Sequence, residues 1–77
     1  MTRVRAVKIA AEMVTSKTTS IIIQKSDEKD VMVFKFHKLD CPNCKVSLAI
    51  NGKVKKECIL NLEDAFPLLV DAIELSS

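Results

Sequence analysis

The sequence predicts an α+β domain in which an antiparallel β-meander of four or five strands precedes one C-terminal α-helix. Two apolar runs flank the pair Asn51-Gly52, which is the strongest short-range signal for a β-hairpin. The C-terminal residues instead repeat apolar side chains at helical spacing. With 77 residues, one glycine and two prolines, the chain fits a single small domain over residues 1–77 rather than a disordered linker.

The N-terminal segment Arg3–Val14 fits two patterns. Apolar residues occupy alternate positions from Val7 to Met13, as they do in a strand. Four apolar residues also recur at helical spacing: Val4, Val7, Ala11 and Val14. We predict a strand, because the polar turn Thr15–Ser20 leads directly into the β-branched run Ile21–Ile23.

The segment Val31–Leu39 is the clearest strand, and a charged loop at Ser26–Asp30 precedes it. Side chains alternate between the two faces of a sheet, so this strand has one apolar and one polar face. The apolar face carries Met32, Phe34 and Phe36, and the polar face carries Lys35 and His37. We therefore expect the aromatic side chains to point into the core.

The hairpin around Asn51-Gly52 permits two registers. A two-residue turn would set each apolar residue of the first strand beside a charge in the second. A three-residue loop over residues 50–52, closed by a glycine bulge, shifts the pairing by one and separates the apolar face from the charged one. We predict this second register. Its pairs include Leu48–Val54, Lys45–Glu57 and Cys44–Cys58.

The C-terminal segment predicts a helix that begins at Ala65, with Asp64 as its N-cap and Pro67 in the first turn. One apolar face should cover the sheet: Phe66, Leu69, Val70 and Ile73. A second apolar stripe lies on nearly the opposite side: Leu68, Ala72 and Leu75. We predict that this stripe forms a homodimer interface. The alternative is that the N-terminal residues 3–14 cover it within one chain.

The single histidine and the three cysteines follow the pattern His-x3-Cys-x2-Cys-x13-Cys. These residues are His37, Cys41, Cys44 and Cys58. Thiolates and imidazole are the ligands that tetrahedral zinc takes, and the predicted register brings the last cysteine to the Cys-x2-Cys turn. The sequence thus predicts a structural zinc site. The alternatives are reduced thiols with a surface histidine, or a disulfide or redox role.

Lysines gather on the predicted outer sheet face, opposite the apolar face. In the preferred register this face carries Lys35, Lys45, Lys53 and Lys55. Such a patch predicts contact with nucleic-acid phosphates. The alternative is a solvated face that keeps the domain soluble, because the chain has no Tyr or Trp on which bases could stack.

The junction between the last strand and the helix carries a short motif. Leu60, Asn61 and Glu63 in this junction resemble the transcriptional positive cofactor four family of single-stranded-DNA-binding coactivators. The resemblance extends from Ile21 to Glu74. It implies a dimer that holds single-stranded DNA on its sheet surface with basic and aromatic residues.

Composition narrows the functional classes. No apolar run approaches the length of a membrane span, and charged residues interrupt the N-terminal segment where a signal peptide would be apolar. An odd number of cysteines suits the reducing cytoplasm or nucleus. With one histidine and no catalytic arrangement, we expect no enzyme. The sequence predicts a dimeric regulatory module that binds nucleic acid. The alternative is a protein-interaction module, an inhibitor or adaptor of a larger enzyme, stabilised by zinc.

Overall fold

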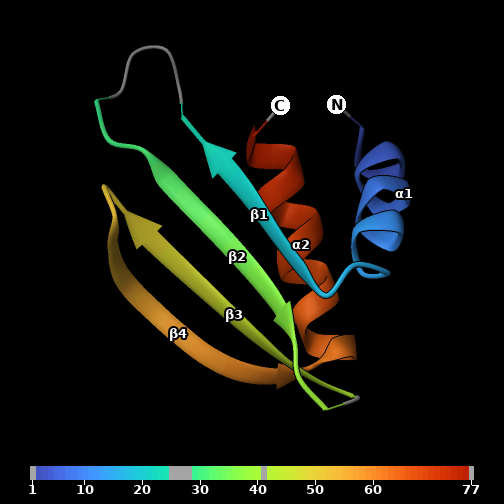
Figure 1. Ribbon diagram of the computed structural model, residues 1–77. Helices are drawn as coiled ribbons and strands as arrows, with labels where there is room; N and C mark the ends of the chain where they lie inside the picture. The colour runs from blue at the N-terminus through green and yellow to red at the C-terminus, as the bar shows by residue number, and fades with distance from the viewer. Residues whose placement is uncertain (1, 25–28, 41, 77) are drawn as a thin grey trace.

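The computed structural model describes residues 2–24, 29–40 and 42–76, which form one four-stranded sheet and two helices (Figure 1). The elements are α1 (Arg3–Met13), β1 (Thr18–Ile23), β2 (Met32–Lys38), β3 (Asn43–Ile50), β4 (Lys53–Asn61) and α2 (Leu62–Ser76). The strands lie in the order β1-β2-β3-β4, and each neighbouring pair is antiparallel. The predicted meander with a C-terminal helix is therefore confirmed, with four strands.

The N-terminal segment is a helix, so the predicted strand is wrong. The side chain of Thr2 caps this helix by accepting a hydrogen bond from the Arg5 N–H. Ala6 and Ala10 are fully buried, and their small side chains let α1 approach α2 closely. In Figure 1 the two helices lie side by side. The alanines are good helix formers, and their contact with α2 favours a helix over the strand that the alternating apolar residues predicted.

The core lies between α2 and one face of the sheet, called here the inner face. The buried strand residues on this face come from the first three strands: Ile21, Ile23, Phe34, Phe36, Cys44 and Val46. From α2 the buried residues are Ala65, Leu69, Val70, Ala72 and Ile73. The largest fully buried side chains are Phe36, Leu69 and Val70. As predicted, the β2 phenylalanines point inward.

The β3–β4 hairpin turns through two residues, so the predicted three-residue loop is wrong. Ile50 is directly opposite Lys53, and the φ angles of Asn51 and Gly52 are 52° and 84°. Positive φ at both central residues is the type I′ geometry, whose twist matches that of the strands. The Asn51 side chain also accepts a hydrogen bond from the Val31 N–H at 3.0 Å, which ties the turn to the residue just before β2.

An irregularity between Leu48 and Ala49 then shifts the register, because Lys55 has no partner on β3. The shift sets Cys58 opposite Val46, and Leu60 opposite Cys44. The predicted Cys44–Cys58 pairing is therefore wrong. A β-bulge of this kind re-aims the following residues. Here it turns Cys58 and Leu60 toward the inner face without lengthening the turn.

Helix α2 begins at Leu62, three residues before the predicted start. The Asn61 side chain accepts a hydrogen bond from the Asp64 N–H at 2.9 Å, so Asn61 takes the capping role predicted for Asp64. Pro67 consequently lies inside the helix, a position that costs about 3 kcal/mol. The acidic residues of the first turn, Glu63 and Asp64, favour this start through the helix dipole.

Candidate functional site

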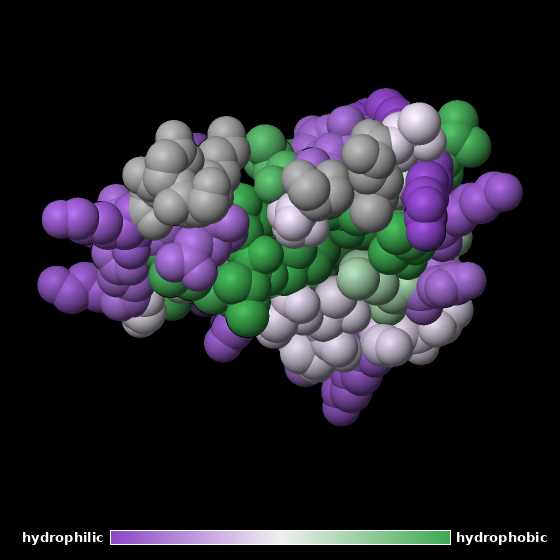
Figure 2. Space-filling view, turned by 90° about the horizontal axis from the view of Figure 1, so that it is seen from above, coloured by the Kyte–Doolittle hydropathy of each residue, from purple (hydrophilic) through white to green (hydrophobic). Residues whose placement is uncertain are grey.

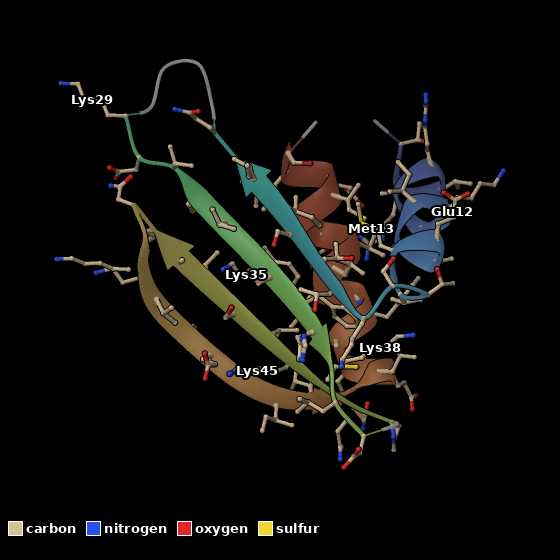
Figure 3. All side chains as sticks on the ribbon, in the orientation of Figure 1. Glu12, Met13, Lys29, Lys35, Lys38 and Lys45 are labelled. Carbon is tan, nitrogen blue, oxygen red and sulfur yellow. The ribbon has the colours of Figure 1, made fainter. Side chains whose placement is uncertain are left out.

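The outer face of the sheet, opposite α2, carries a hollow of about 320 Å³. It is lined by Thr18, Lys35, His37, Lys45, Ser47, Val54 and Glu57. The register explains the grouping, because Lys35 faces Ser47 while His37 faces Lys45 across β2 and β3. In Figure 3 Lys35 and Lys45 lie on these neighbouring strands. The hollow thus combines cationic groups with hydroxyl groups.

The two lysines of the hollow differ in their ion pairing. Lys45 Nζ lies 3.3 Å from Glu57 Oε1, and both side chains are about half exposed. An exposed pair of this kind contributes about 0–1 kcal/mol, so a phosphate can replace the carboxylate at little cost. Within residues 2–24, 29–40 and 42–76, no carboxylate lies within ion-pair distance of Lys35. Lys35 therefore has an ammonium group available to a ligand.

His37 belongs to the same face. Its Nδ1 lies 2.6 Å from the Thr18 hydroxyl oxygen, and the tautomer decides which atom donates. This hydrogen bond fixes the ring at the β1 end of the hollow. The orientation agrees with the alternation in β2, which places His37 on the polar side of the strand.

An aliphatic row crosses the outer face beside the hollow. Its members lie opposite one another on successive strands: Ile22, Val33, Ala49 and Val54. The two end residues, Ile22 and Val54, are 64% and 60% exposed. The outer face is therefore amphipathic, with an apolar row next to the cationic hollow.

The four lysines predicted for one face are divided between locations. Lys35 and Lys45 share the outer face. Lys53 lies opposite Ile50 on the inner side, and Lys55 is the extra residue of the bulge. The prediction is thus wrong for Lys53, because it assumed a three-residue loop, and the placement of Lys55 stays a prediction, because no pairing assigns Lys55 to a face. Thr18 and Ser47 were not predicted, although the alternation of β3 places Ser47 beside Lys45.

The predicted zinc ligands lie on different faces where the structure describes them. Cys44 is buried on the inner face and Cys58 is exposed on that face, whereas His37 lies on the outer face. Cys41 lies outside the described residues. Among the residues that are described, no three His, Cys, Asp or Glu side chains are grouped to hold a metal ion. The zinc site stays a prediction, with His37 separated from Cys44 and Cys58.

The predicted dimer stripe on α2 is only partly open. Leu68 is 41% exposed and Leu75 is 53% exposed, but Ala72 is buried within the chain at 4%. Helix α1 does not cover the two leucines, although it lies against α2. An Arg3 guanidinium nitrogen binds Asp71 at 2.9 Å and Glu74 at 2.7 Å. These hydrogen bonds raise the pKa of Arg3, and the bond to Asp71 has the larger effect.

Charge is segregated between the sheet and the C-terminal helix. Strands β2, β3 and β4 together carry six lysines and one glutamate. Helix α2 carries four acidic residues and no lysine or arginine. Since the net charge of the chain is only +2, this separation, rather than the total, creates a local positive field at the sheet.

No family model matches this chain, and comparisons with curated proteins and with solved structures likewise gave no match. Within the described part of the chain, neither helix has the length and apolar character needed to cross a membrane.

Proposed function

We propose that this protein is a non-enzymatic regulatory module that binds single-stranded nucleic acid on the outer face of its sheet. The observation that carries the proposal is the hollow with the two cationic groups of Lys35 and Lys45, with His37 beside them, on the face opposite the acidic helix α2. Phosphate groups are attracted to such a face, and the four acidic residues of α2 lie on the other side of the sheet, which leaves Glu57 as the acidic residue of the hollow.

Phosphate binding uses the hydroxyl groups as well as the lysines. The ammonium group of Lys35 and that of Lys45 supply charge, while Thr18 and Ser47 supply hydrogen-bond donors at the rim. A phosphate that approaches Lys45 competes with Glu57 for the same ammonium group. Glu57 therefore limits affinity for an anion.

The aliphatic row favours a single strand over a duplex. Single strands expose the faces of their bases, which can lie against the exposed side chains of Ile22 and Val54. Aromatic platforms contribute ~1–3 kcal/mol per stacked base, and the aliphatic row lacks them. Binding is consequently expected to be modest in strength, independent of sequence and strongly dependent on salt.

The test uses fluorescence anisotropy with labelled single-stranded oligonucleotides of two unrelated sequences, measured across a salt series. Replacing Lys35 and Lys45 with Ala should weaken binding equally for both sequences. It should also flatten the slope of log affinity against log salt by about one unit per lost contact. Glu57→Gln should strengthen binding, because it releases Lys45 from its ion pair.

The matched control is Arg5→Ala with Lys8→Ala, two exposed cations on α1 that remove the same net charge. This control should retain most of the affinity. The proposal is refuted if wild-type protein fails to bind any single strand at low salt. Equal losses in the control and in the outer-face variant would show only a general effect of net charge.

We also propose that the protein acts inside the cell as a homodimer. Leu68 and Leu75 leave an apolar stripe on α2 that one chain does not cover. The alternative function, an adaptor or inhibitor of a larger protein, is supported by the same exposed leucines. A monomer that binds no oligonucleotide would favour this alternative.

A further inference from the structure

Strand β4 lacks cover on both of its faces. Eight of its nine residues are exposed, although β1, β2 and β3 each bury two residues on the inner face. The cause is the path of α2, which lies behind β1 in Figure 1 and leaves the inner face near the β3–β4 hairpin open, although Cys44 and Val46 of β3 are buried. A strand exposed on both faces needs a further layer to bury its apolar side chains.

An apolar groove of about 280 Å³ occupies this open part of the inner face. Its principal side chains are Phe34, Val46, Leu48, Lys56, Cys58 and Leu68. Leu68 forms the α2 wall of the groove, and Lys56 forms part of its β4 rim. Figure 2 views the molecule from above and shows apolar surface across the middle of the molecule, between hydrophilic residues on either side.

The exposed side of α2 has a chemistry that complements this groove. Residues at helical spacing alternate between acidic and apolar along one stripe: Asp64, Leu68, Asp71 and Leu75. The groove offers the opposite arrangement, with apolar side chains in its floor and a lysine at its rim. Lys53 lies on the same inner side at the end of the sheet. One chain thus carries both halves of a complementary contact.

We propose that a second copy of this chain occupies the groove, with each α2 placed under the β3–β4 half of the other sheet. This inference rests on the proposed homodimer and assigns its interface. In such a two-fold contact the leucines of α2 meet apolar surface, and Asp64 approaches Lys56 of the other copy. The two helices lie together between two sheets.

Charge favours a second copy over a nucleic-acid occupant in this groove. Leu68 forms the α2 wall of the groove, and the carboxylate of Asp64, one turn before Leu68, repels phosphate but attracts Lys56 of another copy. The contact also leaves both outer faces directed away from the interface. Lys35 and Lys45 therefore remain available to nucleic acid in the dimer. The lysines of the outer face bind phosphate, whereas Lys56 of the inner face contacts the other copy.

The test reverses charge on each side of the contact separately. Sedimentation velocity should show that Lys56→Glu raises the dimer dissociation constant about tenfold, and that Asp64→Lys does the same. An equimolar mixture of the two variants should form a heterodimer, because the reversed charges again face each other. Circular dichroism checks that each variant keeps its fold, which is expected because both residues are exposed.

Two matched controls carry the same charge changes outside the interface. Glu63→Lys alters the residue next to Asp64 but off the stripe, and Lys8→Glu alters an exposed position on α1. Neither should change dissociation. If the wild type is a dimer and neither Lys56→Glu nor Asp64→Lys changes the dissociation constant, the groove is not the interface, although the dimer itself stands. The same conclusion follows if the mixture of the two variants fails to form a heterodimer. Wild-type protein that is monomeric at high micromolar concentration would overturn both.

Discussion

The two halves of the sheet bury very different amounts of their inner face. In the β1–β2 half, Ile21, Ile23 and Phe36 are buried beneath the helices. In the β3–β4 half, Cys44 and Val46 of β3 are buried, but Leu48 is only partly buried and Cys58 is exposed. Both halves have apolar side chains on this face, so composition does not separate them. The position of α2 decides which part of the inner face forms the core and which part, near the β3–β4 hairpin, remains available to a partner.

The largest expected difference lies between two adjacent leucines of α2. Leu69→Glu should unfold the domain, because Leu69 is completely buried and a carboxylate there has no partner. Leu68→Glu should remain folded and change the free energy of unfolding by less than about 1 kcal/mol, because Leu68 lines the open groove. Urea denaturation followed by circular dichroism measures both. Equal destabilisation by the two substitutions would contradict the division of the sheet.

Substitutions of Cys58 and His37 test whether a zinc ion binds to ligands from the inner face, the outer face or both. If zinc binds to the thiolates on the inner face, Cys58→Ser should lower the zinc content and the melting temperature together, since the free energy of binding adds to that of folding. His37→Ala should change neither, because His37 lies on the outer face. Native mass spectrometry of protein purified without chelator measures the metal. A spectrum of apo-protein alone, with three reactive thiols, would remove the zinc prediction.

The smallest effect is expected at the tip of the β3–β4 hairpin. Gly52 has a φ of 84°, and a Cβ added there would meet no atom within 4 Å. Gly52→Ala should therefore cost about 1 kcal/mol through backbone strain alone. Gly52→Asn should cost less, because asparagine tolerates this conformation. Thermal melting compares the two variants, and equal costs would argue against the type I′ turn.

The fold could be predicted from sequence where a single periodicity dominates. The alternation in β2 placed Phe34 and Phe36 inward, and the helical spacing near the C-terminus located α2. The segment Arg3–Met13 supports two periodicities, and its contact with α2, added to the helix propensity of its alanines, favours a helix. The secondary structure of this segment therefore depends on tertiary packing, which a local sequence pattern does not indicate.

The candidate site was predicted only in part, because it depends on register. Lys35 and Lys45 lie on strands whose alternation is regular, and both occupy the outer face as expected. The bulge at Lys55 reverses the face of every β4 residue that follows, relative to an unbulged two-residue turn. Turn composition does not specify such a bulge. The open groove likewise depends on where α2 lies across the sheet.

The most direct test of this account is methyl NMR on one labelled sample, because each face carries its own reporters. Ile22, Val33 and Val54 report on the outer face, whereas Leu48, Leu68 and Leu75 report on the open inner side. Adding a single-stranded oligonucleotide should shift the outer set, and diluting the protein should shift the inner set. An oligonucleotide that shifts the inner leucines and leaves the outer methyls unchanged would contradict the assignment of the two faces.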